Sequence, residues 1–314
     1  MPAAISHWIL GSKIINEQAF KEELPEVNPN AFLWGCQGPD IFFYHRLLPW
    51  QKNDSLKKYG GLLHGCDTTA LFHSISKVCR YCLSREYFPL IYSYALGFCC
   101  HYCYDRLLHP LVYYNIALLE KTGSCGDNYN YHSDVEANMD IILLRRETGL
   151  LISELDIRDC LPKCENLDKA VAAFYTLLLM DIYAFRPSVK SVSTLASDFY
   201  SNISLLNDPH FVKKPVCRAV EKLIPQLNAG TISGLLHTAS EDMSFDYANI
   251  LKNTWFNPDD RSEKSNMNLY EITDTAKFDT LELMLLLSKS IVDKSSVDFA
   301  EFTRSLDFEG RKNS

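Results

Sequence analysis

The chain has 314 residues, of which 47% are hydrophobic and 22% charged, so it is long enough and apolar enough to bury a substantial core. Its formal net charge of −8 disfavours a nucleic-acid partner, because binding a polyanion needs a basic surface. The first residues, MPAAISHWILGSKIINEQ, lack the basic region and the cleavage site of a signal peptide, and no apolar run approaches the roughly 20 residues of a membrane span. We therefore expect a cytoplasmic protein without a transmembrane segment, and leave secretion by another route open.

Apolar residues recur at helical spacing along nearly the whole chain, and the two-residue period of strands is scarce. This pattern predicts an all-α fold with helices near 13–24, 55–83, 86–120, 128–147, 166–185, 187–205, 208–226, 240–254 and 274–294. We expect one multi-helix domain over residues 1–256. Residues 257–314 would form a linker and a C-terminal helical tail packed on that domain, with the last dozen residues frayed.

The eleven cysteines are an odd count in a chain without a visible export signal, which favours reduced thiols. Two CxxC pairs, Cys79–Cys82 and Cys100–Cys103, lie within apolar helical sequence instead of the Gly-rich knuckles of zinc ribbons. We expect these cysteines to be buried and free rather than metal ligands.

The stretch CCHYCYDRLLHP places His101, Asp105 and His109 four residues apart, so on a helix they share one face. Their neighbours are apolar, and a buried carboxylate with two imidazoles would be costly without partners. A zinc ion, which takes imidazole and carboxylate ligands, would satisfy them. Pro110 predicts a kink after His109, which would turn that side chain toward a different metal.

A second helical pair, His132 and Glu136 in YHSDVEANMD, can reach one ion from successive turns. Asp40 follows Gly-Pro, where a turn or a helix cap is its ordinary role. For His64 and His7 the ordinary role is that of a core histidine with a local hydrogen bond. Taken singly, none of these residues identifies a metal site.

Taken in chain order, the local strings GPDIFFYHR, HYCYDRLLHP and HSDVEANMD resemble the zinc-dependent phospholipase C family over about residues 1–145, and YANILKNTWFNPDDRSEKSN is similar to a downstream segment of bacterial members. The resemblance implies an all-helical domain that holds zinc ions in a cleft and hydrolyses phospholipids on the diacylglycerol side. It assigns a first zinc to Asp40, His64, His101 and Asp105, and a second to His109, His132 and Glu136. Asp105 would bridge to a third zinc that His7 also binds.

Secreted members resemble one another in an N-terminal tryptophan that chelates the third ion, whereas this chain begins Met1-Pro2 and Trp8 follows His7. We therefore expect two zinc ions and leave the third undecided. The proposed catalytic residue is Asp40, which would orient or deprotonate the attacking water. Five aromatic residues near Asp40 have two possible roles: they belong to the ordinary core, as most aromatic residues do, or they line the cleft and cage a choline-type ammonium. They are Phe42, Phe43, Tyr44, Trp50 and Tyr59.

These expectations favour a zinc-dependent phosphodiesterase that acts on a phospholipid or a related small phosphodiester. Two alternatives stay open: a single-strand nuclease-like zinc phosphodiesterase, which the acidic balance disfavours, and a non-catalytic helical module with a closed metal site. The sequence indicates neither the lipid head group nor the oligomeric state.

Overall fold

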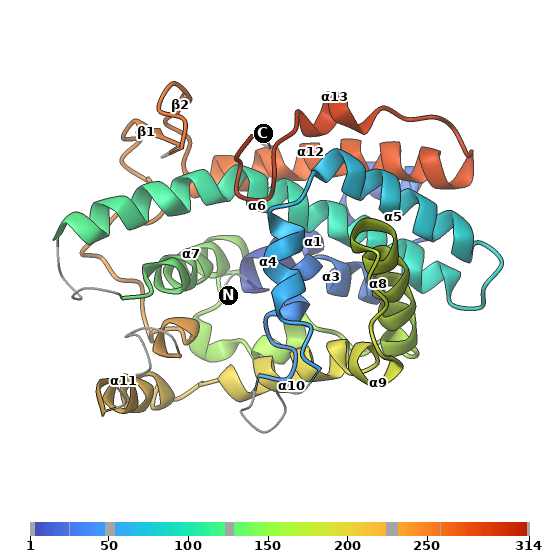
Figure 1. Cartoon of the computed structure of the whole chain (residues 1–314). Helices are drawn as coiled ribbons and strands as arrows, with labels where there is room; N and C mark the ends of the chain where they lie inside the picture. The colour runs from blue at the N-terminus through green and yellow to red at the C-terminus, as the bar shows by residue number, and fades with distance from the viewer. Residues whose placement is uncertain are drawn as a thin grey trace. The chain divides into compact units, whose positions relative to one another are not determined.

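The computed structural model describes residues 4–24, 26–47, 54–122, 129–223, 232–257 and 259–312. These residues are predominantly helical with almost no strand, which confirms the all-α prediction (Figure 1). The α-helices are α1 (Ala4–Asn16), α2 (Gln18–Glu23), α3 (Pro29–Gly35), α4 (Lys58–His64), α5 (Thr68–Cys82), α6 (Phe88–Thr122), α7 (Tyr131–Thr148), α8 (Leu167–Tyr183), α9 (Val189–Val192), α10 (Leu195–Leu206), α11 (Lys213–Leu223), α12 (Leu269–Val292) and α13 (Phe299–Thr303). No described helix is both long enough and apolar enough to cross a bilayer.

Short elements complete the described chain. The 3₁₀ helices are η1 (Gly38–Phe42), η3 (Ile152–Glu154), η4 (Ile157–Cys160) and η5 (Ser233–Leu235). The strands β1 (Trp255–Phe256) and β2 (Lys264–Ser265) pair antiparallel, so the stretch predicted as a linker contains a small hairpin.

The chain divides into two compact units, which we describe separately. Unit 1 comprises residues 1–9, 107–160 and 203–275, and unit 2 comprises residues 10–106, 161–202 and 276–314. Helix α6 contributes residues 88–106 to unit 2 and residues 107–122 to unit 1. The predicted boundary at residue 256 stays a prediction.

In unit 2, helix α5 packs against α8 and α13, and α4 packs against η1. The core around α6 is aromatic: Tyr94 and Phe98 contact Phe174 of α8, and Tyr94 shares a hydrogen bond with Tyr175. The Tyr175 hydroxyl donates to the carbonyl of Gly38, 2.7 Å away. These contacts hold η1 against the helical core.

In unit 1, η5 packs against both α7 and α11. The carboxylate of Asp140, which is fully buried on α7, accepts hydrogen bonds from the backbone N and the Oγ of Ser6 at 2.8 and 2.5 Å. Its other oxygen lies 3.0 Å from Nε2 of His237. Asp140 therefore ties the start of α1 and the segment after η5 to α7.

Several helix ends follow from local capping chemistry. The side chain of Asn28 accepts from the backbone N of Ala31 at the start of α3, where Pro29 occupies the first turn. Asp67 caps α5 in the same way, so the helix predicted over 55–83 is two helices separated at residues 65–67. Pro110 lacks a backbone N–H, but it does not end α6, which continues through it to Thr122.

Three predictions about elements were wrong. The segment 240–254 is not helical: the Asp246 carboxylate accepts from the backbone N of Ile250 and Leu251, and Asn249 and Lys252 take left-handed φ values of 52° and 57°. Residues 4–12, left out of the predicted helices, belong to α1. The C-terminal residues up to 312 are not frayed, because Phe308 is fully buried.

Candidate metal centre

Four predicted ligands gather in unit 2, and we call them the unit 2 cluster: Asp40, His64, His101 and Asp105. Asp40 lies on η1, His64 is the last residue of α4, and His101 and Asp105 lie one turn apart on α6. All four side chains are buried.

The distances within the unit 2 cluster fit a tetrahedral ion. Nε2 of His64 lies 3.2 Å from Oδ1 of Asp40 and 3.5 Å from Oδ2 of Asp105. Nε2 of His101 lies 3.0 Å from Oδ2 of Asp105, 3.8 Å from Oδ1 of Asp40 and 3.5 Å from Nε2 of His64. Ligands at 2.0–2.2 Å from zinc in a tetrahedron are about 3.4 Å apart, so these atoms already stand at the separation that zinc imposes.

The hydrogen bonds of the two imidazoles define which nitrogen is available. Nδ1 of His64 faces the carbonyl of Gly60 at 2.8 Å, and Nδ1 of His101 faces the carbonyl of Cys36 at 3.1 Å. A carbonyl only accepts, so each Nδ1 carries the proton and each Nε2 presents a lone pair. Two lone pairs and two carboxylates then converge in a buried place, which is stable only around a cation.

A proton is the substitute when no metal is bound. Burial alone lowers the pKa of His64, but the hydrogen bonds and charges of Asp105 and Asp40 outweigh burial and raise this pKa to about 10. The cluster is therefore built to hold positive charge at its centre.

Gly38 and Phe308 complete the walls of the unit 2 cluster. Gly38 has a left-handed φ of 48°, and a Cβ on it would stand 2.4 Å from the His101 ring, so only glycine fits. The ring of Phe308 lies 5.1 Å from that of His64 and 5.8 Å from that of His101. The sequence analysis missed Phe308, because nothing in the local sequence marks a contact with residues some 200 positions upstream.

His109, His132 and Glu136 gather in unit 1, and we call them the unit 1 cluster. Oε1 of Glu136 lies 3.1 Å from Nε2 of His132 and 3.6 Å from Nε2 of His109. Burial favours a raised pKa at Glu136, but His132 and His109 outweigh it and hold the pKa of this carboxyl well below its usual range. Among the described residues, its buried Oε2 has no hydrogen-bond partner. These donors fit a zinc ion, and the side chain of His132, 28% exposed, leaves one side of the cluster open.

His7 is fully buried on α1 in unit 1, next to Ser6, whose bonds to Asp140 anchor that helix. His101 and Asp105 belong to unit 2. A third ion shared by His7 and Asp105 therefore stays a prediction. Asp140 itself, which follows Glu136 by one turn, pairs with Ser6 and His237 instead of joining the unit 1 cluster.

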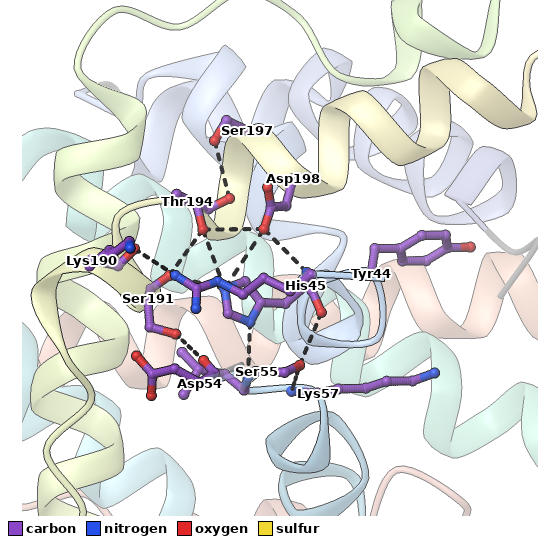
Figure 2. Close-up of polar contacts among 12 residues, drawn as sticks. Tyr44, His45, Asp54, Ser55, Lys57, Lys190, Ser191, Thr194, Ser197 and Asp198 are labelled. Carbon is purple, nitrogen blue, oxygen red and sulfur yellow. Dashed lines mark hydrogen bonds and ion pairs between the residues drawn. The ribbon is translucent and has the colours of Figure 1, made fainter. Parts of the chain in front are cut away.

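One further histidine of the motif GPDIFFYHR has a structural role (Figure 2). Nδ1 of His45 accepts from the backbone N of Leu56 at 2.8 Å, and Nε2 donates to the carbonyl of Ser191 at 3.0 Å. Burial lowers the pKa of His45 more than Asp198, 3.8 Å away, raises it. The neutral ring thus joins the chain after η1 to the start of α4 and to α9.

Three of the five aromatic candidates belong to the core among the described residues. Phe42, Tyr44 and Tyr59 are buried and pack on other rings: Phe42 on Tyr175, Tyr44 on Phe199 and Tyr59 on Phe185. Phe43 lies against His64, and Trp50 falls outside the described residues. These large apolar rings stabilise the core, because burying an aromatic side chain removes a large apolar surface from water.

The candidate metal groups of the described chain contain only histidine, aspartate and glutamate, and the ten described cysteines are free. The sequence profile of the family described as "Zinc dependent phospholipase C" matches residues 6–185, which include every ligand of both clusters. The chain belongs to the zinc-dependent phospholipase C family. Comparison with curated proteins and with solved structures gave no match.

Membership in a family of zinc-dependent phospholipase C hydrolases gives the metal and the general class of function. The donor chemistry of both clusters agrees with zinc. The match ends just after α8, so the family profile does not cover α9 to α13, which are known from the structure alone.

Proposed function

We propose that the protein hydrolyses the phosphodiester bond of a phospholipid on its diacylglycerol side, with one zinc held by each cluster. The observation that carries the proposal is the convergence of buried imidazole and carboxylate groups in the unit 2 cluster at tetrahedral separations. The family match supports the lipid substrate.

Bound zinc supplies Lewis acidity, which offsets the negative charge that builds on a phosphodiester under attack and makes water a nucleophile near neutral pH. The chain's residues hold and orient this chemistry. His64 and His101 present Nε2 because the carbonyls of Gly60 and Cys36 fix their rings. Oδ1 of Asp40 faces the imidazoles, so its second carboxylate oxygen remains available. We propose that this oxygen accepts the proton of the attacking water.

The unit 1 cluster is the more open of the two. It has three protein ligands, and its partly exposed His132 leaves a side from which substrate can enter. Catalytic zinc sites commonly combine three protein ligands with one open position, whereas structural sites are closed. This arrangement supports a catalytic zinc site over the closed, non-catalytic module.

The test combines metal content with hydrolysis. We expect purified protein to contain at least two zinc ions per chain, to release diacylglycerol from phosphatidylcholine and to hydrolyse a chromogenic phosphocholine ester. Glu136→Gln should lower turnover by about 100-fold or more, because metal ligands and their charge are essential to such sites. Glu147→Gln, the same change on the same helix α7, is the matched control and should leave turnover unchanged.

Three results would contradict the proposal. Fewer than two zinc ions per chain would reject the assigned clusters. Faster hydrolysis of single-stranded DNA than of the phosphocholine ester would favour the nuclease-like alternative. Full zinc loading without hydrolysis of either substrate would favour the non-catalytic module.

A further inference from the structure

Helix α11 of unit 1 exposes its apolar side. Six residues at spacings of three and four share one face of this helix and of the residue that precedes it. All six are exposed, with Val216 60% and Leu223 80% accessible to solvent. We call them the α11 stripe: Val212, Pro215, Val216, Ala219, Val220 and Leu223.

The buried side of α11 is polar and sets the orientation of the helix. Nζ of Lys214 lies 2.9 Å from Oδ1 of Asp134 on α7 and donates to the carbonyl of Leu236 at 2.7 Å. The buried Glu221 carboxylate accepts from the backbone N of Ile232 and Ser233 at 2.6 and 2.8 Å. Because these charged groups anchor the inner side, the stripe faces away from unit 1.

Basic side chains flank the stripe. At 100° per residue, Arg218 and Lys222 lie along one edge of it and Lys213 along the other. Lys213 donates to the carbonyls of Leu205 and Asn207, while Arg218 and Lys222 are exposed. The only acidic residue of α11, Glu221, is buried, so the exposed surface of this helix is apolar and positive in a protein of net charge −8.

We propose that α11 docks on the surface of an anionic lipid bilayer, with the stripe among the upper acyl chains and Arg218 and Lys222 on head-group phosphates. An apolar face bordered by Lys and Arg is the pattern of helices that lie in a membrane interface. The net negative charge of the protein acts weakly at such a contact, because charges farther away than about 8 Å are screened at physiological salt.

The docking surface goes beyond the proposed function, because binding to a lipid surface can be tested whether or not the protein hydrolyses the lipid. Helix α11 lies outside residues 6–185, the part that matches the family. Through Lys214 it packs on α7, the helix that carries His132 and Glu136. Docking by α11 would therefore bring the helix of the unit 1 cluster to the lipid surface.

The experiment is cosedimentation of the full, zinc-loaded chain with vesicles of phosphatidylcholine alone and of phosphatidylcholine mixed with phosphatidylserine. We expect binding to the anionic vesicles and a weakening by about tenfold or more in Val216→Glu/Val220→Glu, which puts charge into the interface. Arg218→Glu/Lys222→Glu should abolish the preference for phosphatidylserine. Val189→Glu, which adds one glutamate at a valine 80% exposed on α9, is the control for a charge placed outside the stripe and should bind like the wild type.

Hydrolysis of the soluble phosphocholine ester reports on the metal centre separately and should be the same in all these variants. Unchanged vesicle binding in Val216→Glu/Val220→Glu would overturn the docking surface, as would equal binding to neutral and anionic vesicles. If size-exclusion chromatography shows that this variant converts a dimer to a monomer while its vesicle binding persists, the stripe covers a second copy of the chain and the proposal is wrong.

Discussion

The hydrogen-bond partners of the two ring nitrogens distinguish a candidate ligand histidine from a structural histidine in this protein. Both nitrogens of His45 contact backbone groups, so its ring is fully used by the fold. His64 and His101 use only Nδ1 in this way and direct Nε2 toward carboxylates. All three histidines are buried, so burial does not distinguish them.

This difference predicts that the same change, histidine to alanine, has different effects at the two kinds of position. His101→Ala should lower the zinc content by about one ion per chain, because it removes a ligand of the unit 2 cluster. His45→Ala should keep the zinc but lower the free energy of unfolding by about 2–4 kcal/mol, since it removes two buried hydrogen bonds and leaves a cavity. Metal analysis by mass spectrometry and urea unfolding measure the two effects.

His210→Ala, at an exposed position, is the control for both measurements. Loss of zinc from His45→Ala in protein that remains folded, or normal zinc in His101→Ala, would show that the two histidines are wrongly assigned.

At the scale of the elements, the unit 2 cluster depends on a close contact between α3 and α6. A Cβ on Gly97 of α6 would stand 2.1 Å from the carbonyl oxygen of Phe32 and 2.8 Å from the backbone N of Cys36. A Cβ on Gly35 would stand 2.1 Å from the carbonyl oxygen of Tyr94. The two backbones therefore touch here, and the carbonyl of Cys36 is held within reach of Nδ1 of His101.

We expect Gly97→Ala to lower the free energy of unfolding by about 2 kcal/mol or more, because the methyl group would push the two backbones apart. It should also weaken zinc binding, since the carbonyl that orients His101 would move. Gly61→Ala on α4, where a Cβ meets nothing within 4 Å, should change stability by less than about 1 kcal/mol. Thermal unfolding and zinc titration of the two variants provide the comparison. Equal stability of both would show that the backbones are not in contact.

Local periodicity was sufficient to predict that ligands four residues apart share a helix face, as His101 and Asp105 do on α6. It failed at 240–254, where the apolar spacing is helical but the Asp246 side chain takes the backbone N–H groups that a helix would use. The convergence of Asp40 and His64 on α6 depends on packing between distant segments. Only the resemblance to a family predicted it.

The contacts that support the ligands could not be predicted at all. Phe308 reaches the cluster imidazoles from the end of the chain, and Asp140 finds Ser6 and His237 across more than 90 residues on either side. Such contacts leave no periodic signal, because each involves a single residue whose neighbours are ordinary. Asp140 was part of the sequence YHSDVEANMD, but its partners were not apparent there.

At the scale of the whole molecule, each of the two units contains one cluster of metal-binding groups. Zinc binds the folded state through several segments at once, so its binding free energy adds to stability. We expect saturating zinc to raise the melting temperature by about 5 °C or more relative to protein treated with a chelator, on the usual scaling for chains of this size.

Hydrogen exchange tests whether both units respond. Zinc should slow exchange in α4, which ends at His64, and in α7, which carries His132 and Glu136. In His132→Ala, zinc should no longer slow hydrogen exchange in α7. If zinc changed hydrogen exchange in α4 and α7 of this variant to the same extent, the two clusters would not be separate sites.

The four-residue spacing of His101, Asp105 and His109 on the uninterrupted helix α6 constrains how this protein can evolve. Each residue added to a helix turns everything after it by about 100°. A single-codon insertion or deletion between 101 and 109 would therefore rotate one group out of its place while leaving the helix intact. Orthologous genes should keep this nine-residue block without gaps.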